Sequence, residues 1–227
     1  MAGLQRQQLV RLTTAAWERV LAGSHLPESS ACLEHWAAQG LPLVVGRQRD
    51  DGDPRWIDVG LPAPLRWGRQ RLPLRLCADD IAGIDRFPAL DRVADLPLSR
   101  AVRAAVRALC AALAARRTAA RVYGSYGWQL LTGLDYLRPQ SDLDLLLDAG
   151  NAAAVDALAA ELARFPFDAP RLDGEIVFAD GRAVAWREWR DWRAGRSARI
   201  LVKGIRTLDL VSAADWSTHA PSLALAA

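Results

Sequence analysis

The sequence predicts an α+β fold built from two units. The first part of the chain combines helical stretches with short strand-like runs, and the later part contains a strand–turn–helix–strand segment followed by an Asp-Gly pair of the kind that joins hairpin strands. Pro88 and Pro97 bracket a connecting segment between the two parts. We therefore expect a small N-terminal α+β unit over residues 1–88 and a second unit over residues 97–227.

Composition limits the class of protein. The chain has 227 residues, of which 51% are hydrophobic and 24% charged, so it can bury a core and is not intrinsically disordered. No apolar run reaches the roughly 18 residues of a membrane helix, and the first residues lack the apolar segment of a signal peptide. Three widely separated cysteines and three histidines argue against a zinc site or a disulfide framework. We expect a cytoplasmic protein that does not bind a membrane.

The charge is only mildly basic. The formal net charge is +3 and the pI about 9.0, which is not by itself a nucleic-acid-binding signature. Among 29 basic residues there is a single lysine, Lys203. Either Lys203 survives by chance in an arginine-biased sequence, or it stands where a compact point charge is needed.

The N-terminal part predicts two helices, over residues 14–22 and 30–39, with Ser30 as the N-cap of the second. Short strands are expected over residues 43–45, 56–59 and 72–76, and we expect them to pair antiparallel. Four arginines cluster near the last of these strands and form either a solvated basic face or an edge that faces an anion: Arg66, Arg69, Arg71 and Arg75.

The C-terminal part predicts a helix over residues 99–115, capped by Ser99, because apolar residues recur there at helical spacing. Further helices are expected over residues 126–132 and 151–164. Strands are expected over residues 121–123, 141–148, 175–178, 183–186, 199–203 and 207–211. Most of the nine tryptophans should be core anchors, including the late cluster of Trp186, Trp189 and Trp192.

Two aspartates alternate on one predicted strand. Asp142 and Asp144 should point to the same face, while Leu143 and Leu145 point into the core. Two neighbouring carboxylates repel each other unless a proton or cation intervenes, and Mg²⁺ is a hard cation held by one or two carboxylates together with substrate phosphates. Taken alone, the pattern is better explained by a solvated edge strand.

A glycine and a serine precede this strand at the start of a predicted helix. Gly124 allows close approach to the backbone, and the helix N-terminus and the Ser125 hydroxyl offer hydrogen-bond donors to a phosphate. A plain capped turn would have the same sequence. Together with Asp142 and Asp144, however, these residues predict a polyphosphate site beside a metal site, as needed for attack by a hydroxyl on a phosphate.

These motifs resemble the nucleotidyltransferase superfamily that includes DNA polymerase beta. The spacing departs from the short form of the motif, since sixteen residues separate Ser125 from Asp142. The longer sequence pattern is similar to that of the phosphoribosyl-dephospho-CoA transferases of malonate decarboxylase. Matching positions are frequent over residues 97–212 and sparser before them. The pattern includes Val122-Tyr123-Gly124-Ser125, Tyr136-Leu137-Arg138-Pro139, Ser141-Asp142-Leu143-Asp144-Leu145-Leu146, Leu172-Asp173-Gly174-Glu175 and Leu201-Val202-Lys203.

The resemblance implies a polymerase-beta-type mixed sheet with flanking helices in the second unit. It implies an Mg²⁺-dependent nucleotidyltransferase that takes 2′-(5″-triphosphoribosyl)-3′-dephospho-CoA, attaches the phosphoribosyl-dephospho-CoA group to a serine of the apo acyl carrier protein of malonate decarboxylase, and releases pyrophosphate. No nucleic acid takes part in this reaction.

The resemblance also assigns roles to residues. Asp142 and Asp144 are the expected metal ligands and catalytic residues, and Gly124 and Ser125 the expected substrate contacts. The superfamily usually has a third carboxylate on a later strand, for which we favour Glu175 over Asp173. Lys203 and Arg138 are the expected cations at the leaving pyrophosphate, whereas Arg187 and Glu188 are expected to pair with each other.

Three alternatives stay open. The same transfer could serve the carrier protein of citrate lyase, or the chain could be a nucleotidyltransferase acting on a protein or an RNA. A module without catalytic activity that binds acidic partners through its arginines is a third reading, which the converging carboxylates disfavour.

Overall fold

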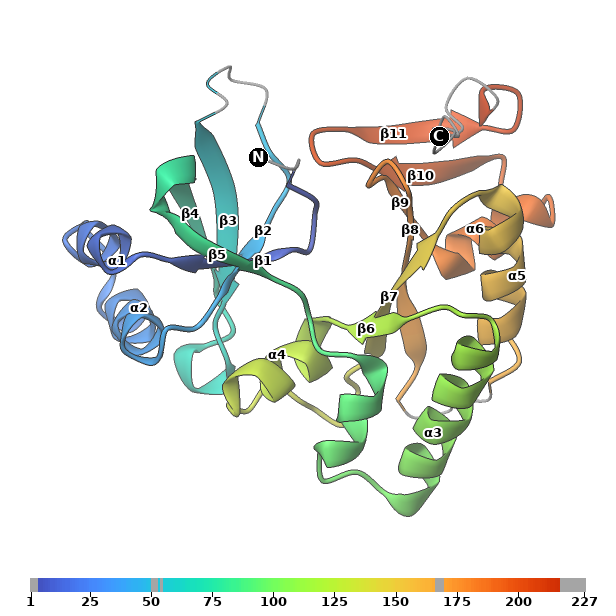
Figure 1. Ribbon diagram of the computed structural model, residues 1–227, viewed down its shortest axis with the longest axis horizontal. Coiled ribbons are helices and arrows are strands. Elements are labelled where there is room, and N and C mark those ends of the chain that lie inside the picture. Colours follow the sequence, from blue (N-terminus) through green and yellow to red (C-terminus); the bar gives the residue numbers. More distant parts are fainter. Residues whose placement is uncertain (1–3, 50–52, 54, 166–169, 217–227) are drawn as a thin grey trace.

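The computed structural model describes residues 4–49, 53, 55–165 and 170–216. Within them the chain forms two β-sheets that stand side by side, each with helices on its outer face (Figure 1). The expected α+β fold is confirmed.

The N-terminal sheet is antiparallel throughout, with strand order β4-β3-β2-β1-β5. Helices α1 (Thr14–Leu21) and α2 (Pro27–Gln39) bury Trp17, Leu33 and Trp36 against it. Its strands are β1 (Leu9–Leu12), β2 (Leu43–Val45), β3 (Trp56–Pro62), β4 (Arg71–Cys77) and β5 (Ile81–Asp85).

The start of α2 corrects a prediction. The helix begins at Pro27, its N-cap is Leu26, and no side chain caps it, so Ser30 lies inside the helix. Proline at the first position explains the earlier start, because its missing N–H would have had no partner in a helical first turn. Ser99, by contrast, accepts a hydrogen bond from the Val102 N–H and caps α3 as predicted.

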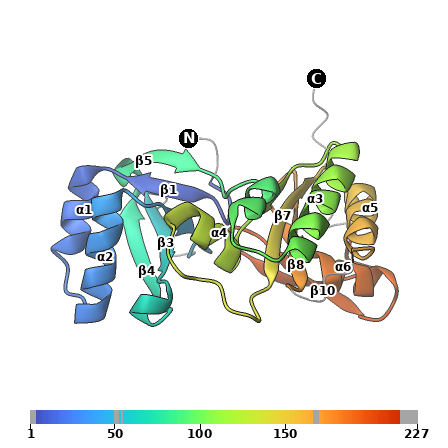
Figure 2. The same cartoon turned by 90° about the horizontal axis from the view of Figure 1, so that it is seen from below.

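The C-terminal sheet is mixed, with strand order β11-β10-β9-β8-β7-β6 and a parallel pair, β7 and β8, next to the edge strand β6. Helices α3 (Arg100–Ala115), α5 (Ala152–Leu162) and α6 (Trp186–Arg193) cover the face that points away from the N-terminal unit (Figure 2). Its strands are β6 (Ala120–Val122), β7 (Leu143–Ala149), β8 (Leu172–Phe178), β9 (Ala183–Ala185), β10 (Arg199–Lys203) and β11 (Leu208–Ser212).

Helix α6 was missed by the sequence reasoning, which predicted a strand ending at Trp186. Trp186, Trp189 and Trp192 are buried, as expected of core anchors, and their spacing of three residues is the helical signal that could have revealed α6.

Helix α4 (Gly124–Thr132) connects the two units. It follows β6 in the second sheet, yet Trp128 and, beyond the helix, Tyr136 belong to the hydrophobic core of the N-terminal unit. The Tyr136 hydroxyl donates to the Pro62 carbonyl at 2.6 Å, and the rings of Phe87 and Trp128 meet edge to face at 5.5 Å. Shared packing of this kind holds the inner faces of the two sheets opposite each other. No helix in the described ranges is long and apolar enough to span a membrane.

Candidate active site

The carboxylates lie on the inner face of the C-terminal sheet. Leu143, Leu145 and Leu147 of β7 are fully buried against the helices, so Asp144 points to the opposite face, toward the N-terminal unit. The parallel register pairs Asp144 with Asp173 of β8 and Leu146 with Glu175. Asp144, Asp173 and Glu175 therefore share one face of adjacent strands.

Gly124 brings the start of α4 against Asp144. It adopts a left-handed conformation with φ 60°, and a Cβ at this position would lie 2.0 Å from the Asp144 Oδ2. Both requirements can be met only by glycine. The Tyr123 N–H also donates to the Asp144 carbonyl at 3.0 Å, so the turn between β6 and α4 is fixed to β7 beside its carboxylate.

The environment of Asp144 disfavours negative charge. Burial, followed by the nearby Asp173 and Asp142 carboxylates, raises its pKa to about 7. Asp142 behaves in the opposite way, since hydrogen bonds from Arg171 lower its pKa. Arg171 Nη2 lies 2.5 Å from Asp142 Oδ2 and 3.1 Å from Asp173 Oδ2, so one guanidinium lies between two of the three aspartates.

Asp173 and Glu175 have different partners. Glu175 is only 5% exposed, accepts a hydrogen bond from Lys203 Nζ at 2.7 Å, and lies 3.7 Å from Arg6 Nη1 of the N-terminal unit. Asp173 is half-buried and lies directly across from Asp144. Glu175 as the third catalytic carboxylate stays a prediction, but its charge is already balanced by two cations.

The donor set suits a divalent cation. Asp144 and Asp173 supply hard carboxylate oxygens from two adjacent strands. Asp142 supplies another from just before β7, which begins at Leu143 and not at residue 141 as predicted. The raised pKa of Asp144 marks a place where a positive charge would relieve repulsion. Among the described residues, no three acidic, histidine or cysteine side chains converge tightly enough to bind a metal as they stand. Arg171 occupies the position between Asp142 and Asp173, so it would have to yield to an ion.

A cleft of about 750 Å³ separates this face from the N-terminal sheet. On one side it is lined by Tyr123, Gly124, Ser125, Trp128, Tyr136 and Asp144, and on the other mainly by β3, β4 and residues near the end of β2. Burial and the nearby carboxylates raise the pKa of Tyr123, which keeps its phenol a hydrogen-bond donor. Asp144 and the Gly-Ser motif therefore open onto one large cleft, whereas Asp142 is not part of its lining.

The two remaining predicted residues lie farther out. Arg138 is exposed on the loop before β7, where its backbone N–H donates to Ser141 Oγ at 2.9 Å. Lys203 lies on β10 and is engaged with Glu175. Arg187 does not take Glu188 as its partner, and instead donates to the Leu172 carbonyl at 2.8 and 3.1 Å, at the start of β8.

Sequence reasoning missed Arg6, Arg171 and Tyr123. Arg171 carried a usable signal, since it stands two residues before Asp173 and the side chains of alternate residues share a face of a strand. Arg6 had no such signal, because its approach to Glu175 depends on how the two units pack.

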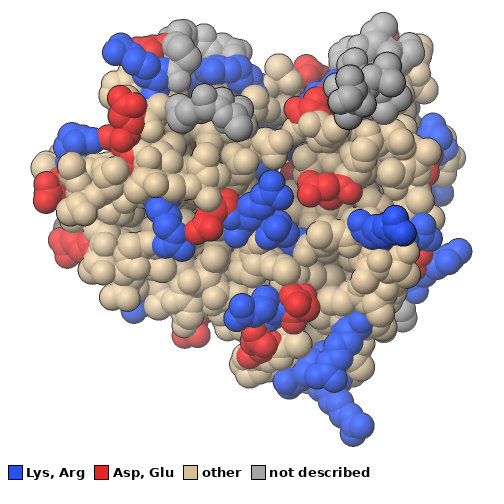
Figure 3. Space-filling model, viewed as in Figure 1, with Lys and Arg blue, Asp and Glu red and all other residues tan. Residues whose placement is uncertain are grey.

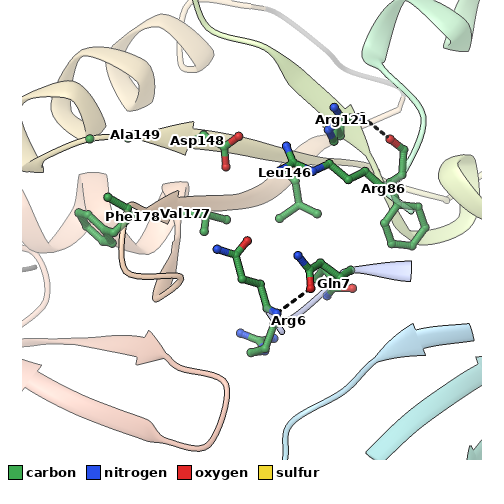
Figure 4. A pocket seen from close by; sticks show the side chains of 14 residues that line it. Arg6, Gln7, Arg86, Arg121, Leu146, Asp148, Ala149, Val177 and Phe178 are labelled. Carbon is green, nitrogen blue, oxygen red and sulfur yellow. Dashed lines mark hydrogen bonds between the residues drawn. The ribbon is translucent and has the colours of Figure 1, made fainter. Parts of the chain in front are cut away.

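A second, smaller cavity of 390 Å³ lies farther along the same face (Figure 4). It is surrounded by Arg86, Arg121 and Asp148, with Arg6 and Gln7 opposite β7. Gln7 lines both cavities and so lies between them. Over most of the face shown in Figure 3, basic and acidic side chains are interspersed.

Comparison with known proteins assigns the family. The family model for the phosphoribosyl-dephospho-CoA transferase MdcG C-terminal domain matches residues 89–214, and the model for the MdcG N-terminal domain matches residues 5–87. The chain belongs to this family of transferases. The resemblance seen in the motifs is thereby confirmed.

Individual relatives agree over most of the chain. A phosphoribosyl-dephospho-CoA transferase from Bradyrhizobium diazoefficiens is 33% identical over 222 residues, covering 91% of this chain and 89% of its own. Another from Xanthomonas axonopodis pv. citri is 39% identical over 194 residues, covering 83% and 85%. No solved structure matches the chain. The protein is an enzyme, a transferase of the nucleotidyltransferase type.

Proposed function

We propose that this enzyme transfers the phosphoribosyl-dephospho-CoA group of 2′-(5″-triphosphoribosyl)-3′-dephospho-CoA to a serine of the apo acyl carrier protein of malonate decarboxylase. The observation that carries the proposal is the contact between the start of α4 and Asp144, which places helix N–H groups beside a set of carboxylates in one cleft. The family fits this chemistry, since its members carry the name of the transferred group.

The reaction exchanges one bond to phosphorus for another. The serine oxygen of the carrier attacks the α-phosphorus of the triphosphate, the bond from that phosphorus to the bridging oxygen breaks, and pyrophosphate leaves with the electron pair. The serine proton passes to a carboxylate, for which we favour Asp173, the neighbour of Asp144 on β8. The product is a phosphodiester.

The chain's own groups have separate tasks in this scheme. The N–H groups of the first turn of α4 and the Ser125 hydroxyl orient the triphosphate. Asp142 and Asp144 would hold Mg²⁺, which neutralises charge that develops on the phosphate oxygens. Lys203 and Arg138 are proposed to attract the leaving pyrophosphate. We place the reaction in the cytoplasm, where cysteines stay reduced, and Cys32, Cys77 and Cys110 are free.

The deciding experiment combines the protein, the triphosphoribosyl precursor, Mg²⁺ and apo carrier protein, and then measures the mass of the carrier. We expect the carrier to gain one phosphoribosyl-dephospho-CoA group and pyrophosphate to appear in equal amount. Chelation with EDTA should stop both. Transfer without any added divalent ion after chelation would contradict the metal assignment.

The same assay distinguishes the alternatives. Replacing the carrier by that of citrate lyase tests the acceptor, and faster transfer to it would reassign the partner. Replacing the precursor by ATP tests a nucleotidyltransferase that acts on proteins or RNA, and labelling from ATP would favour that activity. A module that only binds would leave the carrier mass unchanged in every arm.

A further inference from the structure

The arginines of the N-terminal sheet point to a second anion site in the cleft. We propose that Arg69 and Arg71 bind the diphosphate of the dephospho-CoA portion of the substrate, so that the N-terminal unit recognises the group being transferred. This inference rests on the proposed function. It takes up the open question of the arginine cluster, because Arg69 and Arg71 line the cleft whereas Arg66 and Arg75 do not.

The backbone positions of Arg69 and Arg71 are set by a strand pairing and by a turn. Arg71 is the first residue of β4 and pairs in register with Pro62, the last residue of β3. Arg69 has a left-handed conformation with φ 56°, directly after Gly68 with φ 69°. The Ala63 N–H donates to the Gln70 carbonyl at 2.8 Å, which closes the turn. Few non-glycine residues adopt this left-handed conformation. The turn holds the Arg69 backbone in it, and so determines the point from which the Arg69 side chain extends.

This turn lies where the two units meet. The Pro62 carbonyl accepts the hydrogen bond from the Tyr136 hydroxyl, and Tyr136 lines the cleft together with Trp128, Ser125 and Asp144. The arginine pair and the start of α4 are thus parts of one cleft rather than two separate surfaces.

The charges of the pair are available to a ligand. Among the described residues, neither Arg69 nor Arg71 forms an ion pair with a carboxylate, whereas Arg49 in the same cleft lies 3.4 Å from Asp58 Oδ1. Arg66, outside the cleft, stacks on Trp67 with its guanidinium carbon 3.7 Å from the ring centre. Arginine forks match phosphate oxygens well, and two unpaired arginines in one cleft favour a diphosphate.

The chemistry of the substrate requires two anion sites. It carries a triphosphate on one ribose and a diphosphate on the other side of the adenosine. In the proposed reaction the start of α4 and an ion held by Asp142 and Asp144 would take the triphosphate, so the diphosphate would need other cations, and Arg69 and Arg71 offer them in the same cleft. The lining of the same cleft also includes small or apolar residues of β3 and β4, on which an uncharged chain can lie: Gly60, Pro62, Leu72, Pro73 and Leu74.

The test uses two probes that separate the sites: dephospho-CoA, which lacks the triphosphate, and inorganic tripolyphosphate with Mg²⁺. Binding of each to the full-length protein is measured by calorimetry. The variant is Arg69→Asn with Arg71→Gln, since asparagine tolerates the left-handed conformation and glutamine keeps much of the arginine stem. The control removes two exposed arginines of the distant α3, Arg100→Gln with Arg107→Gln, and so matches the change in charge.

We expect the Arg69 and Arg71 variant to bind dephospho-CoA roughly tenfold or more weakly, because charge-assisted hydrogen bonds are lost, while tripolyphosphate binding and the control stay within about twofold. Retained tripolyphosphate binding also shows that the variant is folded.

Three results would overturn the proposal: unchanged affinity for dephospho-CoA, a loss restricted to tripolyphosphate, or a loss restricted to the apo carrier protein. The same holds if the unaltered protein does not bind dephospho-CoA. The outcome is independent of the proposed reaction, because dephospho-CoA binding can be lost in the variant even if the unaltered protein transfers nothing to the carrier.

Discussion

The two walls of the cleft carry opposite charge although both are inner faces of β-sheets. The wall of the N-terminal sheet presents Arg47, Arg69 and Arg71, and its Asp58 is paired with Arg49. The wall of the C-terminal sheet presents Asp144, with Asp142 and Asp173 beside it. We propose a division of labour, in which the arginines would hold an anionic substrate and the carboxylates would hold a cation that assists the transfer.

The largest expected effect comes from neutralising the carboxylate wall. Asp144→Asn and Asp142→Asn should each lower kcat for carrier modification by about a thousandfold or more, because a misplaced ion loses much of its stabilisation of developing charge. Asp58→Asn on the opposite wall is the matched control and should change kcat less than about threefold, since it removes only a partly exposed ion pair. Carrier mass over time gives all three rates. Near-normal turnover of either site variant at saturating Mg²⁺ would remove that aspartate from the metal site.

Two glycines distinguish the effect of a left-handed backbone from the effect of the close contact with Asp144. Gly124 and Gly40 have nearly the same φ, 60° and 57°, but a Cβ on Gly40 would meet nothing within 4 Å. Gly40→Ala should therefore cost only about 1 kcal/mol of stability and leave the rate unchanged. Gly124→Ala carries the same conformational cost and also displaces Asp144, so we expect kcat to fall roughly a hundredfold.

Thermal unfolding and initial rates on the two alanine variants check this contrast. If both lose activity in proportion to their loss of stability, the contact between Gly124 and Asp144 has no special part in catalysis.

Much of the carboxylate wall could be predicted from the sequence, because its signals are local. The alternation of Leu143, Asp144 and Leu145 fixes which side chains of β7 share a face, and the Asp180-Gly181 pair predicted the hairpin that joins β8 and β9. The start of α4 at Gly124 follows from the same kind of local pattern.

What could not be predicted depends on contacts between distant segments. Strands β1 and β5 are short, and Arg11 and Gly83 break the apolar pattern by which a strand could be predicted from the sequence. These segments form strands because they pair with each other across some seventy residues. The placement of Arg6 beside Glu175 and of Arg69 opposite α4 likewise depends on how the two units pack. The predicted strand began at Glu175 and left Asp173 outside it, whereas β8 begins at Leu172, and only the register of β7 with β8 shows that Asp173 pairs with Asp144.

Substitutions of Lys203 test whether the cluster of Glu175, Lys203 and Arg6 has a structural or a catalytic role. Lys203→Ala leaves the buried Glu175 with only the more distant Arg6, so we expect a loss of about 2–4 kcal/mol in stability. Arg6→Ala should cost less, because its nitrogen lies 3.7 Å from the carboxylate against 2.7 Å for Lys203. If Lys203 also contacts the leaving pyrophosphate, Lys203→Arg should lower kcat despite its retained charge.

A double variant separates the two roles of Lys203. Lys203→Met with Glu175→Gln removes the pair together and should recover most of the lost stability. Recovery of both stability and kcat would make Lys203 a structural residue, whereas recovery of stability alone would show that Lys203 or the predicted catalytic Glu175 takes part in the reaction. The first outcome would contradict the proposal that Lys203 attracts the leaving group.

The smallest expected effect is a difference in pH dependence between carboxylates of the two units. Hydrogen bonds from Arg55 lower the pKa of Asp53 in the N-terminal unit, so its contribution to stability is present above its unfolded pKa and is lost as pH falls.

Asp144 is the reverse case. Its folded pKa of about 7 lies above the ordinary value of 3.8 for an aspartate, so its contribution to stability is full below the unfolded pKa and is lost as pH rises toward 7. Burial is the largest cause of this shift, followed by the neighbouring Asp173, Asp142 and Glu175 carboxylates, and Arg171 opposes it. In EDTA, Asp144→Asn should therefore gain about 2 kcal/mol relative to the unaltered protein between pH 5 and pH 8, a change of several degrees in Tm. Saturating Mg²⁺ at pH 8 should remove this advantage, because an ion that binds the ionised carboxylate stabilises the folded protein and has fewer ligands in the variant. A Tm difference that stays constant across this pH range would show that the carboxylates of this wall do not repel one another in the metal-free protein.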